Sequence, residues 1–143
     1  MVTTRPATPD DKELLRRIHH DAYRDVVTRQ FGPWNEAEQN RWFDKGFVAS
    51  GLRVIELDGV AVGSIASIDE GDQVFLCGVQ ILPEYQNRGI GSELVRAELA
   101  RAKSLGKPLR LQVLRENRAR ALYERLGFQM TGETEHHFTM LAG

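Results

Sequence analysis

The chain has 143 residues, short enough for one domain and long enough to bury most of the surface that the unfolded form exposes. Hydrophobic residues make up 41% and charged residues 27%, a composition that indicates a folded globular protein and excludes a disordered one. The net charge of −1 gives no overall attraction to nucleic acid or to an anionic membrane. We therefore expect a single domain over residues 1–143.

The cysteine count and the N-terminal residues bear on the compartment. The single cysteine excludes an internal disulfide, which fits a reducing environment. The first residues form no apolar signal segment, and no stretch has the apolar length of a membrane span. These features predict a cytoplasmic protein that binds neither nucleic acid nor a membrane.

The first fifty residues predict a short strand and two helices. Residues 2–5 alternate as in a strand, and Thr8 followed by Pro9 is a typical helix start. The apolar side of the first helix is formed by Leu14, Leu15, Ile18, Ala22 and Val26. Asn35 is placed to cap a second helix, which we expect to end at Gly51. The large apolar residues of the second helix are Trp42, Phe43, Phe47 and Val48.

Two adjacent histidines raise the question of a metal site. His19 and His20 lie between or opposite the apolar positions of the first helix, as do Asp21 and Tyr23. Adjacent side chains point apart on a helix, and no third ligand follows at a useful spacing. We predict no metal site.

Three strands in succession are predicted in the middle of the chain. Residues 52–57 and 60–68 flank Asp58-Gly59, which is typical of a two-residue hairpin turn. The apolar run from Val74 to Leu82 is the third strand. Gly78 lies inside that strand, where a glycine indicates either a bulge or close packing.

A turn with two glycines follows this strand and opens a long helix. The apolar stripe of the helix consists of Leu94, Val95, Leu99, Ala102 and Leu105, and Glu98 falls among them without an evident reason. Unpaired N–H groups at the positive end of a helix suit a phosphate, and Gly89 and Gly91 allow a phosphate to approach the backbone. A P-loop does not fit, because Ser92 follows Gly91 in place of lysine. A tight turn without a ligand explains the glycines equally well.

The C-terminal part predicts a strand, a short helix and a hairpin. Residues 109–113 alternate between apolar and polar positions, and Asn117 is placed to cap a helix over residues 118–126. Residues 128–131 and 135–141 then form the hairpin. Three antiparallel strands followed by a strand–helix–strand unit imply a mixed sheet with helices on both faces.

Two blocks of the sequence resemble the GCN5-related N-acetyltransferase (GNAT) superfamily. The first is Gln86-x-x-Gly89-x-Gly91, preceded by Pro83-Glu84-Tyr85, and the second runs from Asn117 to Phe128. The resemblance implies an α/β fold with a mixed, mostly antiparallel central sheet of six to seven strands. It also implies about four flanking helices and a splayed pair of central strands.

The resemblance implies acetyl-CoA as the cosubstrate. In the family the turn wraps the pyrophosphate of coenzyme A, and the pantetheine arm lies between strands that correspond to residues 79–81 and 111–114. The implied cofactor-binding residues are Val79, Gln80, Ile81, Gln86, Asn87, Arg88, Gly89, Ile90, Gly91, Ser92, Asn117 and Tyr123. Tyr123 is also the implied catalytic residue, because the family places this phenol near the sulfur as a proton donor to the departing thiolate. A packed helix tyrosine is the alternative.

The group that accepts the amine proton is left open. Family members carry a glutamate at positions that correspond to Phe75 or Gln112 in this chain. The remaining candidates are Glu70, Asp72, His136 and His137, or an ordered water. Cys77 lies in an apolar strand without an evident histidine partner, so we expect a buried packing residue rather than an acyl-carrying nucleophile.

The resemblance implies acetyl transfer from acetyl-CoA to a primary amine by direct attack, with a small amine or an amino acid as acceptor. In the family the first two helices shape the acceptor pocket, so the aromatic residues of the second helix are either core packing or a wall of that pocket. The alternatives are a non-catalytic CoA-binding or regulatory module and a protein N-terminal or lysine acetyltransferase. The terminal hairpin offers a strand edge through which a homodimer is possible.

Overall fold

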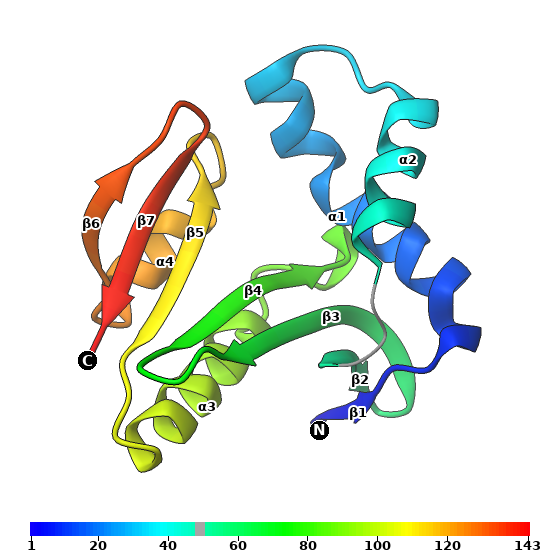
Figure 1. Ribbon diagram of the computed structural model, residues 1–143. Coiled ribbons are helices and arrows are strands. Elements are labelled where there is room, and N and C mark those ends of the chain that lie inside the picture. Colours follow the sequence, from blue (N-terminus) through cyan, green and yellow to red (C-terminus); the bar gives the residue numbers. More distant parts are fainter. Residues whose placement is uncertain (48–50) are drawn as a thin grey trace.

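A seven-stranded sheet organises the chain (Figure 1), as seen in a computed structural model that describes residues 1–47 and 51–143. The strands are β1 (Val2–Pro6), β2 (Leu52–Leu57), β3 (Val60–Asp69), β4 (Val74–Ile81), β5 (Leu109–Leu114), β6 (Gln129–Glu133) and β7 (His137–Ala142). The helices are α1 (Lys12–Phe31), α2 (Glu36–Gly46), α3 (Ile90–Ser104) and α4 (Ala119–Arg125). Short 3₁₀ turns at Pro9–Asp11 and Pro83–Tyr85 precede α1 and α3.

The strand order is β1-β2-β3-β4-β5-β7-β6, and every neighbouring pair is antiparallel except β4 and β5. The prediction of a mixed, mostly antiparallel sheet is therefore confirmed. The hairpin turn between β2 and β3 has positive φ angles of 51° at Asp58 and 84° at Gly59, which match the twist of paired strands. The terminal hairpin is also confirmed, with β7 inserted between β5 and β6.

The parallel pair β4 and β5 separates after a short contact. Only Val74–Leu76 of β4 pair with Leu109–Leu111 of β5. Beyond this point β4 follows β3 to Ile81, whereas β5 follows β7 to Leu114. The two strands diverge in Figure 1, which confirms the predicted splayed pair.

A bulge in β4 marks the point of separation. Ala66 of β3 pairs with Gly78, but the next residue, Ser67, pairs with Leu76, so Cys77 has no partner on β3. An extra residue bends its strand and increases the local twist. Of the two alternatives for Gly78 the structure therefore shows the bulge, with Cys77 as the extra residue, and beyond it β4 no longer pairs with β5.

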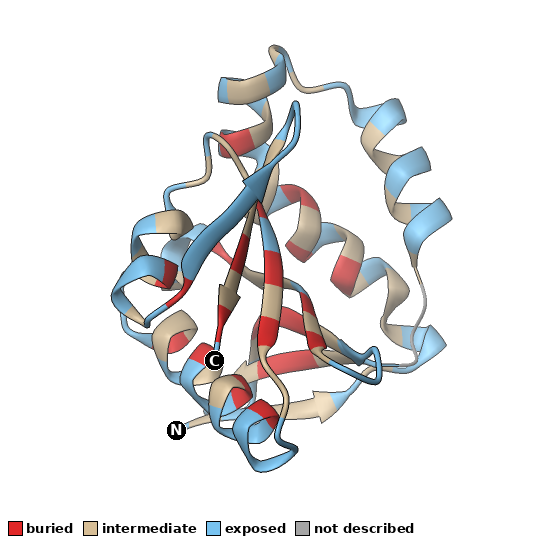
Figure 2. Ribbon diagram, turned by 60° about the vertical axis from the view of Figure 1, so that its left-hand side comes forward, coloured by how far each residue is buried: buried red, intermediate tan, exposed pale blue. Residues whose placement is uncertain are grey.

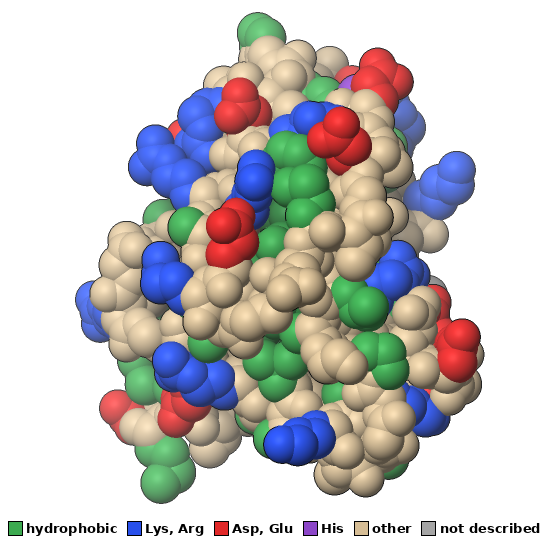
Figure 3. Space-filling model, turned by 90° about the vertical axis from the view of Figure 1, so that its left-hand side faces the viewer, with side chains coloured by type: hydrophobic (Ala, Val, Ile, Leu, Met, Phe, Trp, Pro, Cys, Tyr) green, Lys and Arg blue, Asp and Glu red, His purple; other side chains and the backbone are tan. Residues whose placement is uncertain are grey.

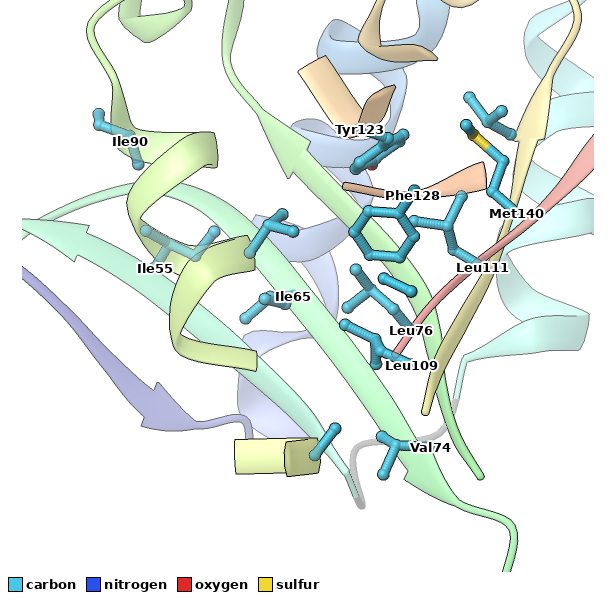
Figure 4. Packing of buried hydrophobic residues seen from close by; sticks show 14 of the residues in the cluster. Ile55, Ile65, Val74, Leu76, Ile90, Leu109, Leu111, Tyr123, Phe128 and Met140 are labelled. Carbon is cyan, nitrogen blue, oxygen red and sulfur yellow. The ribbon is translucent and has the colours of Figure 1, made fainter. Parts of the chain in front are cut away.

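Both faces of the sheet carry a hydrophobic core. Neighbouring residues of a strand point to opposite faces, so Val54 packs with Leu15 and Ile18 of α1, whereas Ile55 packs with residues of the other face. The larger core lies between the sheet, α3 and α4 (Figure 4). Buried residues accordingly gather where the helices cover the sheet, and β6 at the sheet edge is exposed (Figure 2).

The N-terminal helices differ in part from the expectation. The α-helix begins at Lys12, after the 3₁₀ turn, and the Thr8 N–H donates to the Asp11 carboxylate over 2.8 Å. Asn35 caps α2 as predicted, since its Oδ1 accepts the Glu38 N–H over 2.9 Å. The predicted end of this helix at Gly51 is wrong, because α2 ends at Gly46. Val48, assigned to the same helix, lies outside the described residues.

Glu98 interrupts the apolar stripe of α3 and is nevertheless buried, at 4% exposure. Its carboxylate bonds with the Arg53 guanidinium of β2 and lies 3.6 Å from the Arg101 guanidinium. A buried charge is tolerated only when it is paired. The partner on β2 explains the position of Glu98, which the helix pattern alone does not.

The surface carries charges of both signs. In the view of Figure 3, Lys and Arg side chains are interspersed with Asp and Glu. Within residues 1–47 and 51–143, no helix has the length and apolar character that crossing a bilayer requires. The same residues include no group of three or more His, Cys, Asp or Glu side chains arranged to hold a metal ion.

Candidate active site

The gap between β4 and β5 exposes backbone groups of β4. The Leu82 N–H bonds with the Val62 carbonyl over 2.9 Å, and hydrogen-bonded pairs alternate along antiparallel strands. The backbone groups of Val79 and Ile81 therefore face away from β3, toward the gap. The two N–H groups have no hydrogen-bond partner in the described part of the chain. This edge can accept an extended ligand as if it were a further strand.

The Gln86 side chain closes the end of this edge. Its Nε2 donates to the Ile81 carbonyl over 2.9 Å. The chain then turns through Asn87, with φ of 62°, and Gly89, with φ of 83°. Such angles cost a residue with a side chain more than they cost glycine. The predicted motif residues thus shape the passage from β4 to α3.

The N-terminus of α3 presents free amide groups. Gly89 is the N-cap and its carbonyl accepts the Glu93 N–H over 3.0 Å, but no side chain caps the helix. Among the described residues, the N–H groups of Ile90, Gly91 and Ser92 have no partner. These donors lie at the positive end of a helix of 15 residues, which favours an anion.

Positive side chains lie beside these amides. The Arg88 guanidinium stacks on the Tyr85 ring at 5.1 Å from its centroid. A surface pocket of about 530 Å³ borders Arg88 and Gly89, and its charged lining residues also include Arg96 and Glu93, neither of which was predicted from the sequence. Gly91 faces α4, where an added Cβ would lie 3.6 Å from Leu122 Cδ2. The turn is therefore open toward solvent and closed toward α4.

Tyr123 reaches the site from α4. Its side chain is buried, and its ring packs edge-on against Phe128 with the centroids 5.6 Å apart (Figure 4). Burial, and secondarily the neighbouring Tyr23 phenol, raise the pKa of Tyr123 above the ordinary tyrosine value. The phenol is therefore protonated at neutral pH and has a proton available for a hydrogen bond to a ligand. Asn117 lies two residues before α4, and its Oδ1 accepts the N–H of Ala119, the first residue of the helix, over 2.9 Å.

Tyr23 of α1 approaches the gap from the opposite face of the sheet. It was not among the site residues predicted from the sequence. A Cβ added to Gly78 would lie 3.8 Å from the Tyr23 hydroxyl, so this phenol reaches the bulge. Burial raises the pKa of Tyr23, and a hydrogen bond with Gln80 opposes that shift. Gln80 Oε1 also accepts the Ser64 hydroxyl over 3.2 Å. Two phenols thus converge where β4 and β5 separate.

A cavity of about 370 Å³ lies next to this point, between α1, α2 and the sheet. Polar groups on its floor include Gln80 and Ser64, and His19 contributes from α1. Its walls are largely apolar and include Leu15, Trp42, Phe43, Phe47, Leu52 and Ile68. Trp42 is 71% exposed, so core packing does not account for it. The described lining contains no carboxylate.

The four acidic and histidine residues considered as bases lie outside this cavity. Glu70 contacts Gln73 and Arg110, and His136 packs against Phe31. Asp72 and His137 are also absent from the described lining. The expectation of a buried Cys77 is wrong, because this side chain is exposed at the cavity. Partial burial, and secondarily Glu70, raise the pKa of its thiol, which disfavours the nucleophilic thiolate.

The site fits the chemistry of acetyl-CoA. Free amides and arginines at the start of α3 suit a diphosphate, and the open edge of β4 suits the amide groups of a pantetheine arm. A pantetheine arm along this edge would bring its thioester toward the point where β4 and β5 separate. This arrangement is the one expected of an acyl-CoA-dependent transferase.

The sequence matches the acetyltransferase (GNAT) family over residues 13–128. The chain therefore belongs to this family, whose members use acetyl-CoA as the acetyl donor. A [ribosomal protein bS18]-alanine N-acetyltransferase of Haemophilus influenzae is 33% identical over 93% of this chain and 85% of its own length. An uncharacterized N-acetyltransferase of Methanocaldococcus jannaschii is 27% identical over 89% of this chain, which spans only 60% of that relative.

Solved structures share the fold at low sequence identity. The PaiA N-acetyltransferase of Thermoplasma acidophilum, crystallised with coenzyme A, has a TM-score of 0.83 at 18% identity and covers 99% of this chain and 98% of its own. An acetyltransferase of Thermus thermophilus has a TM-score of 0.76 at 20% identity, with 99% and 96% covered. The predicted fold class is confirmed by these similarities.

Proposed function

We propose that this protein transfers the acetyl group of acetyl-CoA to a primary amine by direct attack. The observation that carries the proposal is the separation of β4 from β5 beside the uncapped start of α3. The open edge of β4 offers strand-like hydrogen bonds to a pantetheine arm, and the start of α3 offers amides to a diphosphate. The turn after β4 joins the two. The proposal includes the cofactor-binding residues that the family resemblance implies and Tyr123 as the catalytic residue.

In the proposed reaction the chain contributes orientation and hydrogen bonds. The amine enters from the cavity between α1 and α2, and its nitrogen attacks the thioester carbonyl carbon. The carbon–sulfur bond then breaks and the sulfur leaves as a thiolate. Because the pKa of Tyr123 is raised, its hydroxyl stabilises the thiolate as a hydrogen-bond donor, and solvent supplies the proton that completes the thiol.

The lining of the cavity favours a small apolar molecule with a single amine as the acceptor. Its described walls are aromatic and aliphatic, and no carboxylate is present to hold a second positive charge. An apolar environment also favours the neutral form of an amine, which is the nucleophilic form. A polyamine or a lysine-rich peptide fits this lining less well.

A protein N-terminus is the second candidate acceptor. The bS18-alanine N-acetyltransferase of H. influenzae, at 33% identity, favours it. The exposed Trp42 at the cavity edge supports contact with a larger substrate. A peptide that begins with a small apolar residue would present its α-amine to the same site.

The test is release of thiol from acetyl-CoA by the purified protein in the presence of amines. We expect release only when an amine is added, with arylalkylamines and apolar amino-acid amides faster than putrescine or free lysine. Peptides with N-terminal alanine, compared with the same peptides acetylated at the N-terminus, report the second candidate. Tight acetyl-CoA binding without release for any of these amines would instead indicate a non-catalytic CoA-binding module.

A further inference from the structure

His19 and His20 form a hydrogen-bonded pair beside the cavity. Their Nδ1 atoms are 3.0 Å apart, so one ring donates and the other accepts. His20 is buried, at 4% exposure, whereas His19 lines the cavity. The direction of this hydrogen bond decides which nitrogen of His19 carries its proton.

Asn40 of α2 sets the direction of the hydrogen bond between the two histidine rings. The Asn40 Oδ1 lies 2.8 Å from His20 Nε2 and also accepts an Arg16 N–H over 3.4 Å. Arginine has no acceptor, so the Asn40 atom between the two groups is the oxygen and not the amide nitrogen. Glu36, a further acceptor, lies 3.9 Å from the same His20 nitrogen. His20 Nε2 therefore carries a proton.

For two neutral imidazole rings, the proton on His20 Nε2 fixes the positions of the other ring protons. With its proton on Nε2, His20 accepts at Nδ1, and His19 must donate from its own Nδ1. The second nitrogen of His19, Nε2, then carries a lone pair. No group in the described part of the chain hydrogen-bonds to this atom, which leaves the lone pair available to the cavity.

We propose that His19 accepts the proton of the attacking amine, and that His20 and Asn40 are positioning residues that hold its Nε2 in the acceptor state. This assignment rests on the acetyl transfer proposed above and supplies the base that the sequence did not reveal. Phe75 and Gln112, where family members carry a glutamate, provide no carboxylate.

In this step the amine nitrogen bonds to the carbonyl carbon and its proton passes to His19 Nε2. The carbon–sulfur bond breaks with its electron pair on sulfur, which takes a proton from solvent. His19 returns its proton to solvent before the next turnover. The nitrogen of the tetrahedral adduct is positively charged and much more acidic than the free amine, so a weakly basic imidazole suffices.

The surroundings keep His19 uncharged at neutral pH. Burial, and secondarily His20, lower the pKa of His19 from 6.5 to about 4. Tyr23 and Phe43 pack against His19, Trp34 packs against His20, and Glu36 lies near His20 Nε2. Arg16 reaches Asn40, and Cys77 and Gln80 of β4 line the same cavity as His19. A proton added to His20 would reverse the His19–His20 bond and leave His19 Nε2 as a donor.

Nitrogen-15 NMR of the four histidines shows which ring nitrogen of each carries a proton, and the measurement does not depend on enzymatic activity. At pH 7 we expect His19 as the Nδ1–H tautomer and His20 as the Nε2–H tautomer. Asn40→Leu, which removes the acceptor, should mix the tautomers of both rings, whereas Asn40→Asp should retain them. A His19 ring found with its proton on Nε2 would overturn the inference.

Kinetics test the role in the reaction. We expect His19→Gln to lower kcat about 10²-fold with an unchanged dissociation constant for coenzyme A, as is typical of a lost base. Arg17→Gln, an exposed change on the same helix, is the matched control and should retain wild-type kcat. Equal kcat of His19→Gln and wild type would overturn this step alone. Absence of turnover in the wild-type protein would overturn the proposed function together with the step.

Discussion

Replacing Tyr123 by phenylalanine is expected to lower kcat by about 10²-fold, within the usual range for a lost acid or hydrogen-bond donor. The ring remains and continues to pack against Phe128, so the fold is preserved. Only the donor to the departing thiolate is lost, and coenzyme A affinity should not change. Steady-state thiol release and calorimetric titration with coenzyme A measure the two quantities.

The pH dependence provides a control on the Tyr123 role. Its pKa is raised by burial, so the phenol stays protonated throughout the neutral and mildly alkaline range. We therefore expect no decrease of kcat from Tyr123 up to about pH 10, the ordinary tyrosine pKa. Wild-type activity in Tyr123→Phe would remove Tyr123 from the mechanism.

Substitution of both glycines by alanine, in the double variant Gly89→Ala, Gly91→Ala, should weaken coenzyme A binding by at least about tenfold. Hydrogen bonds from amides to a charged group contribute roughly 1.5–3 kcal/mol each, and tenfold corresponds to about 1.4 kcal/mol. A Cβ at Gly89 holds a phosphate away from the amides of Ile90 and Ser92, and a Cβ at Gly91 adds contact with Leu122 where the turn meets α4. Calorimetric titration gives the affinity directly.

The matched control for this variant is Gly106→Ala at the other end of α3. Gly89 and Gly106 both have positive φ, 83° and 69°, and an added Cβ meets no atom within 4 Å at either position. Gly89→Ala and Gly106→Ala therefore introduce similar backbone strain, but only Gly89 lies at the proposed phosphate site. Equal coenzyme A affinity of the double variant and the control would argue against a phosphate site at this turn.

Local signals in the sequence predicted much of the fold and the cofactor side of the site. The glycine turn, the caps at Asn35 and Asn117 and the bulge at Gly78 depend on residues close in sequence, whose conformational preferences are strong. The separation of β4 from β5 followed from the family resemblance and the bulge together. These features correspond to the structure within a few residues.

The acceptor side depends on contacts between distant segments, and the sequence predicted only part of it, the aromatic residues of the second helix as one of two alternatives. From the sequence, His19 and Tyr23 were interpreted as polar residues between apolar positions. Their i, i+4 spacing places them on one helix face and could have indicated that their side chains meet. Glu98 is explained only by Arg53 of a remote strand. Cys77 was expected to be buried because its neighbours are apolar, whereas the bulge turns it toward the cavity.

Amide hydrogen exchange, resolved by residue and measured with and without coenzyme A, tests most directly whether the ligand binds between β4 and β5. The arrangement predicts slower exchange on binding at Val79 and Ile81, which face the gap, and at Ile90, Gly91 and Ser92, which start α3. The amides of β6, an exposed strand at the far edge of the sheet, should exchange at the same rate in both samples. Tight binding that leaves the five amides unchanged would contradict the account.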